Sequence, residues 1–113
     1  MHEISLCESI LDILVDQARR EHFDRVKRVS VEIGPLSCVE PEALRFGFDA
    51  VMRGSLAEGA ALEIVPTSAT AFCPDCGAVV PVSSRFDVCP ACGGVALQVR
   101  TGDELRIREL EVV

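Results

Sequence analysis

The stretch FCPDCGAVVPVSSRFDVCPACGGVAL, residues 72–97, decides how this chain is organised. It holds two Cys-x-x-Cys pairs with twelve residues between them, and a glycine follows each pair. Two such turns can place four thiolates around one ion in a tetrahedron, which suits Zn(II) or a single iron ion. The pattern predicts a zinc-binding four-cysteine module over residues 70–98, with the ligands Cys73, Cys76, Cys89 and Cys92.

All four predicted ligands are protein sulfurs, so no coordination position stays open for water and we expect a structural ion. Zinc is favoured, although the spacing also fits iron. The alternatives are two disulfides, four free thiols or a thioredoxin-like redox motif. Disulfides are disfavoured because the N-terminus lacks a basic region and a small-residue cleavage site, which predicts no signal peptide and a reducing cytoplasmic location. Proline and glycine crowd both pairs, which argues against the redox motif.

Before the module, the hydrophobic pattern predicts helix, strand, helix and strand. Apolar residues recur every three or four positions over residues 5–20, including Cys7, Ile10, Leu11, Ile13 and Leu14. Ser5 and Glu8 fit a capping box at the start of that helix. Alternation over residues 26–33 predicts a half-buried strand that Gly34-Pro35 ends.

The second predicted helix begins near Pro41, since proline suits the first helical turn, and Gly54 is its expected C-cap. Residues 60–65 form the next strand and residues 67–71 a linker. The strand over 104–112 changes phase near Arg108–Glu109, which a β-bulge or one exposed apolar pair would explain.

This order predicts an α+β fold: two helices on a small three-stranded mixed sheet, with the zinc-ribbon-like module inserted. Residues 1–66 plus 103–113 then form the α/β domain. The second helix serves as the crossover between two parallel strands.

Length and charge exclude several functional classes. The chain has 113 residues and a net charge of −7, with no Trp or Tyr. An acidic chain without these stacking side chains is a poor candidate for binding nucleic acid or an anionic membrane. No apolar run approaches the roughly 18 residues of a membrane-spanning helix. We also expect no enzymatic activity, because no nucleophile–base pair, phosphate loop or open catalytic metal position is evident.

The N-terminal residues Met1, His2 and Glu3 offer a second candidate metal site. The α-amine, the amide nitrogen of His2 and its imidazole can close two adjacent chelate rings, and the amide or carboxylate of Glu3 can complete a plane. Square-planar nitrogen sites favour Ni(II) or Cu(II). The simpler readings are a solvated His2 and a Glu3 that stabilises the helix dipole. Cys7 and Cys38 are expected to pack, and His22 to lie at a helix end.

Three segments resemble the HypA/HybF family of hydrogenase maturation nickel metallochaperones: the N-terminal MHE, the run GPLSCVEPEALRFGF (34–48) and the CPDCG…CPACGG module. The resemblance covers essentially the whole chain. It implies a nickel domain with an inserted zinc domain, His2 as the key nickel ligand with the Met1 amine and Glu3 nearby, and the four module cysteines as zinc ligands. In some members an acidic residue matching Glu40 joins the nickel site.

The resemblance also implies partners. Members pass nickel to the large subunit of [NiFe] hydrogenase together with the GTPase HypB, and in some bacteria they also serve urease maturation. Two other readings stay open on the residues alone. A zinc-ribbon adaptor would show salt-dependent retention on DNA, whereas a rubredoxin-like electron carrier would be red and redox-active.

Overall fold

The computed structural model describes residues 2–113, and Met1 lies outside the described residues. The elements are α1 (His2–Glu21), β1 (Val26–Ile33), α2 (Pro41–Met52), β2 (Ala61–Pro66), β3 (Ala69–Phe72), β4 (Val79–Val82), β5 (Gln98–Thr101) and β6 (Leu105–Val112). The strands form two three-stranded sheets, ordered β2-β1-β6 and β4-β3-β5. The predicted α+β class, with two helices, a three-stranded sheet and an inserted cysteine module, is confirmed.

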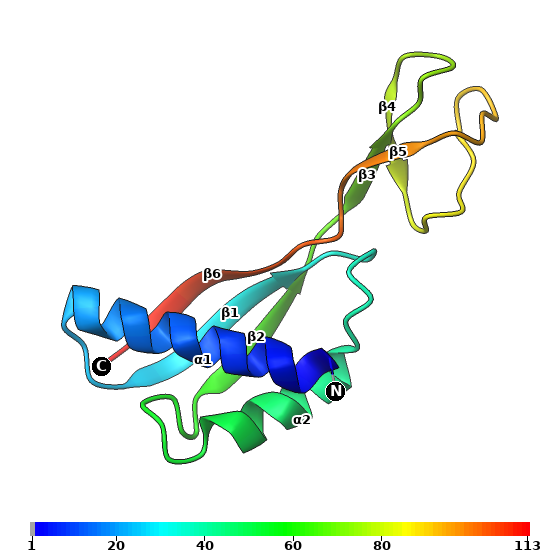
Figure 1. Cartoon of the computed structure of the whole chain (residues 1–113). Coiled ribbons are helices and arrows are strands. Elements are labelled where there is room, and N and C mark those ends of the chain that lie inside the picture. The colour runs from blue at the N-terminus through cyan, green and yellow to red at the C-terminus, as the bar shows by residue number, and fades with distance from the viewer. Residues whose placement is uncertain (1) are drawn as a thin grey trace. The chain divides into compact units, whose positions relative to one another are not determined.

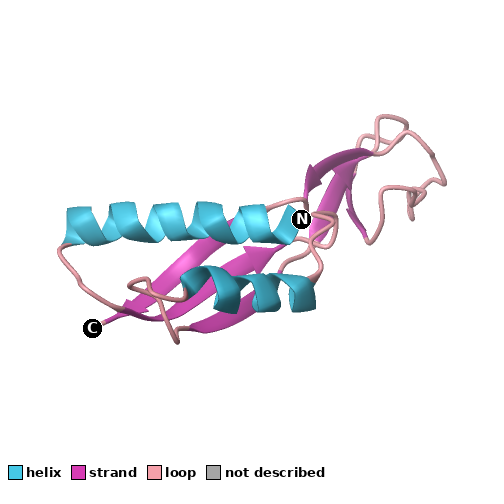
Figure 2. Ribbon diagram, turned by 60° about the horizontal axis from the view of Figure 1, so that its bottom comes forward, coloured by secondary structure: helices cyan, strands magenta, loops and turns pink. Residues whose placement is uncertain are grey.

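The chain divides into two compact units. The first contains the residues up to Val31, Val39–Ile64 and Ile107–Val113, and the second contains Glu32–Cys38 and Val65–Arg106. In the first unit, both helices lie on one face of the β2-β1-β6 sheet (Figures 1 and 2). Strands β1 and β2 run in the same direction and β6 runs opposite to them (Figure 1), so this sheet is mixed, as α2 acting as a crossover requires.

The core of the first unit follows the predicted apolar faces. Burial is nearly complete for one stripe on each helix and for the inner face of β1: Cys7, Ile10, Leu14, Leu44, Phe48, Met52, Val29 and Val31. Ile13 departs from the prediction, because 47% of it is exposed. In β6 the half-buried positions are Leu105, Ile107 and Leu110. The alternation of half-buried and exposed residues along β6 therefore shifts by one residue near Arg108–Glu109, as the sequence pattern indicated.

Helix α1 begins three residues earlier than predicted, at His2. The capping box of Ser5 and Glu8 is therefore wrong, since both residues lie inside the helix. Glu3 stands in the first turn instead. A carboxylate there interacts favourably with the free N–H groups and the positive end of the helix dipole. This extension places His2 and Glu3 on a helix rather than on a loose chain end.

The start of α2 agrees with the sequence analysis, whereas its C-cap is Arg53 and not the predicted Gly54. Glu40 is the N-cap, its Oε1 accepts a hydrogen bond of 2.8 Å from the N–H of Glu42, and Pro41 occupies the first helical position. After the last helical residue come Arg53 and then Gly54, whose φ of 75° lies in the left-handed region. Glycine ends a helix in this conformation without the steric cost of a Cβ.

The second unit contains more regular structure than the sequence predicted. Residues 67–71 were assigned to a linker, and this is wrong because β3 covers Ala69–Phe72. Strand β3 pairs antiparallel with both β4 and β5. Ala69 and Ala71 are buried on one face, while the hydroxyls of Thr70 and Thr101 lie 2.8 Å apart. Four residues alone do not specify a strand, so the pairing partners decide this segment.

Candidate metal centres

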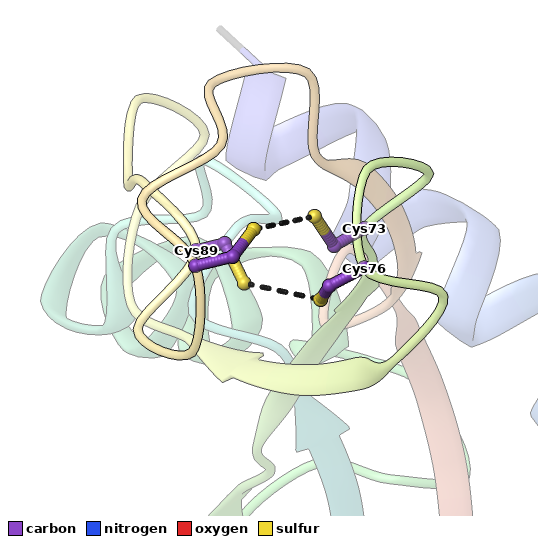
Figure 3. Close-up of side chains that lie close together, drawn as sticks. Cys73, Cys76 and Cys89 are labelled. Carbon is purple, nitrogen blue, oxygen red and sulfur yellow. Dashed lines mark hydrogen bonds between the residues drawn. The ribbon is translucent and has the colours of Figure 1, made fainter.

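The four cysteines of the module come together in the second unit. Their sulfur atoms all lie within 4.8 Å of one another. The Sγ atoms of Cys73 and Cys92 are 3.6 Å apart, and those of Cys76 and Cys89 are 3.8 Å apart (Figure 3). Cys73 and Cys89 are buried, whereas Cys76 and Cys92 are exposed. Each Cys-x-x-Cys pair therefore supplies one inner and one outer sulfur.

The two pairs have the same backbone structure. The N–H of Cys73 donates to the carbonyl of Ala78, and the N–H of Gly77 donates to the carbonyl of Cys73. In the second pair, Cys89 donates to Gly94 and Gly93 donates to Cys89, with lengths between 2.8 and 2.9 Å throughout. Gly77 and Gly93 have φ values of 74° and 75°. Glycine permits this tight turn, which directs both sulfurs of a pair to the same point.

The sulfur distances fit one tetrahedral zinc ion. A Zn–S bond of about 2.3 Å places sulfurs at tetrahedral corners roughly 3.8 Å apart, and two of the separations are 3.6 and 3.8 Å. A disulfide needs about 2.05 Å, so these cysteines are not paired covalently. Four soft ligands at this spacing can hold Zn(II) or iron and leave no position for a substrate.

Hydrogen bonds and burial give the thiols of Cys89 and Cys92 very different pKa values. Burial acts to raise the pKa of the Cys89 thiol, but backbone N–H groups at Cys92 and Ala91 outweigh it and lower this pKa to about 7. The N–H of Gly94 acts to lower the pKa of Cys92, but the Cys73 thiol and burial outweigh it and raise this pKa to about 12. A metal ion must displace the remaining protons, so we expect its affinity to rise with pH.

The module has a small apolar core of its own. Val80 is buried together with Cys73 and Cys89, and the partly buried apolar residues Ala78, Val82 and Leu97 pack against them. Two of the three buried residues in this cluster are therefore candidate metal ligands. Small units with little apolar burial depend on other sources of stability, and a bound metal is a common one.

The candidate nickel residues gather where the two helices of the first unit begin. Oε2 of Glu3 accepts a hydrogen bond of 3.3 Å from the N–H of Glu40, and Nδ1 of His2 lies 3.8 Å from the same oxygen. The hydrogen bond from Glu40 lowers the pKa of Glu3 below its ordinary range, and the Glu3 N–H and the nearby His2 act in the same direction. Glu3 is therefore a carboxylate at neutral pH, held between His2 and the start of α2.

His2 is available at the surface. Its side chain is 60% exposed, whereas that of Glu3 is 16% exposed. The first N–H groups of an α-helix have no carbonyl one turn earlier to accept them. A metal ion can therefore displace the proton of the His2 or Glu3 amide nitrogen without breaking a hydrogen bond of the helix. The third predicted ligand residue, Met1, lies outside the described residues.

Three other residues named in the sequence analysis lie outside the two candidate ligand sets. Cys7 is fully buried, as predicted, and its Sγ donates to the carbonyl of Leu44 at 3.5 Å. Cys38 was expected to pack, but its side chain is exposed in a left-handed turn with φ of 61°. His22 directly follows α1 with φ of 59°.

Residue spacing alone did not connect Glu40 to Glu3, and Glu40 was named only through the family resemblance. Spacing also did not single out Gly94: a Cβ there would lie 2.6 Å from Oδ2 of Asp75 and 3.3 Å from the sulfurs of both Cys73 and Cys92. The signal was present, since Ala78 stands at the matching position after the first pair whereas the second pair ends Gly-Gly.

Within residues 2–113, no helix combines the length and the hydrophobicity needed to cross a membrane.

Comparison with known proteins identifies the family. The profile described as "Hydrogenase/urease nickel incorporation, metallochaperone, hypA" matches residues 1–112. The chain is 56% identical to the hydrogenase maturation factor HypA of Azotobacter chroococcum, with 99% of each chain covered. It is 53% identical to the factor of the same name from Paracoccus denitrificans over the full length of both.

Solved structures agree with this result. The solution structure of the Ni metallochaperone HypA from Helicobacter pylori matches with a TM-score of 0.75 and 26% identity, and covers 98% of this chain and 97% of its own. A second solution structure of a HypA protein matches with a TM-score of 0.74 and 28% identity, over 100% and 97%. The chain therefore belongs to the HypA family of hydrogenase/urease nickel incorporation metallochaperones.

Proposed function

We propose that this protein binds Ni(II) at its N-terminus and delivers it for the maturation of [NiFe] hydrogenase, while a zinc ion in the four-cysteine module maintains the fold. The observation that carries the proposal is the group formed by His2, Glu3 and Glu40 at the start of the two helices. It sets an exposed imidazole beside a carboxylate that is charged at neutral pH. Family membership supplies the nickel context.

The proposed nickel ligands are the Met1 amine, the imidazole and amide nitrogen of His2, and Glu3. Nitrogen donors in a plane select Ni(II) or Cu(II) over Zn(II). Glu40 is the next candidate ligand, because its N–H contacts the Glu3 carboxylate, and its own carboxylate would have to release the N–H of Glu42 to bind the ion. A site at the surface end of a helix can exchange its ligands with a recipient protein more readily than a closed cage of four sulfurs.

Zinc is proposed for Cys73, Cys76, Cys89 and Cys92. Sulfur separations of 3.6 and 3.8 Å and the matched backbone turns of the two pairs support this assignment. The bound ion would screen the thiolates from one another and tie the two turns together. Removing it with a strong chelator should therefore unfold the second unit, because few apolar side chains hold that unit together without it.

We further propose that the chain acts as a carrier and not as an enzyme. Its expected partners are the GTPase HypB and the large subunit of [NiFe] hydrogenase, together with urease maturation proteins where urease is present. The family description, which names both hydrogenase and urease, supports this assignment at the level of the family. We propose that the protein acts in the cytoplasm, where the zinc-binding thiols stay reduced.

The test is metal stoichiometry by elemental analysis on protein with an unmodified N-terminus. We expect about one Zn and one Ni per chain. His2→Ala should lose nickel and keep zinc. His22→Gly is the matched control, because it removes the other histidine at the opposite end of α1 and suits the left-handed backbone there. Nickel binding that survives unchanged in His2→Ala would refute the N-terminal site.

A second variant tests the free amine. A two-residue Gly-Ser extension before Met1 leaves every side chain in place but moves the amine away from His2. We expect this variant to bind nickel much more weakly and zinc unchanged. Unchanged nickel affinity in the extended protein would remove the amine from the ligand set.

A further inference from the structure

Gly47 of α2 lies where the two helices approach closely. A Cβ at this position would lie 3.0 Å from Cδ1 of Ile4, 3.4 Å from Sγ of Cys7 and 3.7 Å from Cα of Ile4. Ordinary contacts between carbon atoms are about 3.5–4.0 Å. A side chain at residue 47 would therefore require the start of α1 or the Ile4 side chain to shift by a few tenths of an ångström.

The helical preference of glycine does not explain its presence there. Gly47 is in the middle of the helix Pro41–Met52 and is buried. Glycine weakens a helix interior relative to alanine, so a glycine at such a position needs a packing reason. The contact with Ile4 and Cys7 supplies one.

This contact is next to the proposed nickel site. Ile4 directly follows Glu3, and the Sγ of Cys7 donates to the carbonyl of Leu44, which fastens the same part of α1 to α2. The hydrogen bond from the Glu40 N–H to Glu3 measures 3.3 Å, at the long end of the range for such bonds. Moving the helices apart by about half an ångström would therefore weaken it.

We propose that Gly47 is a positioning residue for the nickel site. Its missing Cβ lets α1 come close enough to α2 for Glu3 to accept the hydrogen bond from Glu40, and this bond holds the Glu3 carboxylate beside His2. The inference rests on the proposed function for its link to nickel. Its structural part, the control of the Glu3–Glu40 contact by residue 47, is testable without any nickel.

The experiment uses Gly47→Ala in the zinc-loaded, full-length protein. We expect the amide of Glu40 to exchange its hydrogen about tenfold faster in nickel-free protein, as measured by NMR, because it loses a charge-assisted hydrogen bond. With Ni(II) added, the visible ligand-field spectrum should change and nickel should dissociate faster. Thermal stability and zinc content should be preserved, since alanine favours the helix.

The matched control is the double variant Gly47→Ala with Ile4→Val. Valine lacks the Cδ1 atom that the new Cβ would meet at 3.0 Å. We expect the double variant to restore both the Glu40 exchange rate and the nickel spectrum, and Ile4→Val alone to resemble the parent. A general loss of packing would instead add the effects of the two substitutions, so restoration distinguishes positioning from simple destabilisation.

The exchange measurement and the nickel measurements can each overturn a different part of the proposal. Unchanged Glu40 exchange in Gly47→Ala would overturn the control of the Glu3–Glu40 contact by residue 47. Faster exchange with an unchanged nickel spectrum and dissociation rate would overturn the link from that contact to nickel. If the parent itself binds no nickel at the N-terminus, the proposed function fails, while the exchange measurement still decides the structural part.

Discussion

Substituting Gly94→Ala tests how tightly the second cysteine turn closes around the metal. The new Cβ would lie 2.6 Å from Oδ2 of Asp75 and 3.3 Å from the sulfurs of Cys73 and Cys92. The Asp75 side chain can rotate away, but two ligand sulfurs fixed by a metal cannot both withdraw. Overpacking of this kind costs about 1–3 kcal/mol. We expect the module to close more loosely without its metal, so most of this cost should fall on the zinc-bound state.

We therefore expect zinc affinity to fall by roughly 5- to 150-fold. Competition with a chromophoric zinc chelator measures this change directly. Asp75→Ala in the same chain should restore little of the loss, because the Asp75 side chain can already rotate away and the two sulfur contacts remain. A Gly94→Ala protein that holds zinc as tightly as the parent would refute the close geometry described for this site.

Three further predictions concern stability and reactivity. His22→Gly should stabilise the protein by about 0.5–1 kcal/mol in urea unfolding, because it relieves a left-handed backbone at a non-glycine residue; a destabilised variant would contradict this. Burial, and to a smaller extent the charge of Glu3, raises the pKa of Cys7 to about 11. A thiolate-directed reagent at pH 8 should therefore label the exposed Cys38 well before Cys7. Mass spectrometry of the labelled peptides measures this order. Hydrogen bonds from the Thr67 hydroxyl and then from the Gly102 N–H lower the pKa of Glu104. The stability that this carboxylate provides is therefore present above its unfolded pKa of about 4.3 and is lost as pH falls through the lower folded pKa. The difference in unfolding free energy between the parent and Thr67→Val should shrink over that pH range, and a constant difference would refute the linkage.

The features that the sequence predicted best depend on neighbours in the chain. Each Cys-x-x-Cys-Gly turn contains its own hydrogen bonds, so its spacing alone indicated four converging sulfurs. The apolar stripes of the helices and the alternation in β1 likewise repeat with the period of the element. Pro41 marked the start of α2 because the missing N–H of proline costs nothing there.

The features that the sequence did not predict depend on contacts far along the chain. Helix α1 starts at His2 with Glu3 in its first turn, where the carboxylate contacts the N–H of Glu40, 37 residues away. Strand β3 consists of four residues whose conformation depends on pairing with β4 and β5. Met1, His2 and Glu3 alone left two readings open, a nickel or copper site and a solvated His2, and the family resemblance supplied the choice of nickel and the partners.

The central claim is that nickel is held by the N-terminal amine and His2, apart from the cysteines. X-ray absorption at the nickel edge, on untagged protein loaded with one equivalent of Ni(II) and one of zinc, tests it most directly. We expect only nitrogen and oxygen atoms around nickel, with zinc surrounded by four sulfurs in the same sample. Sulfur in the nickel shell, at the expense of the sulfurs around zinc, would contradict it.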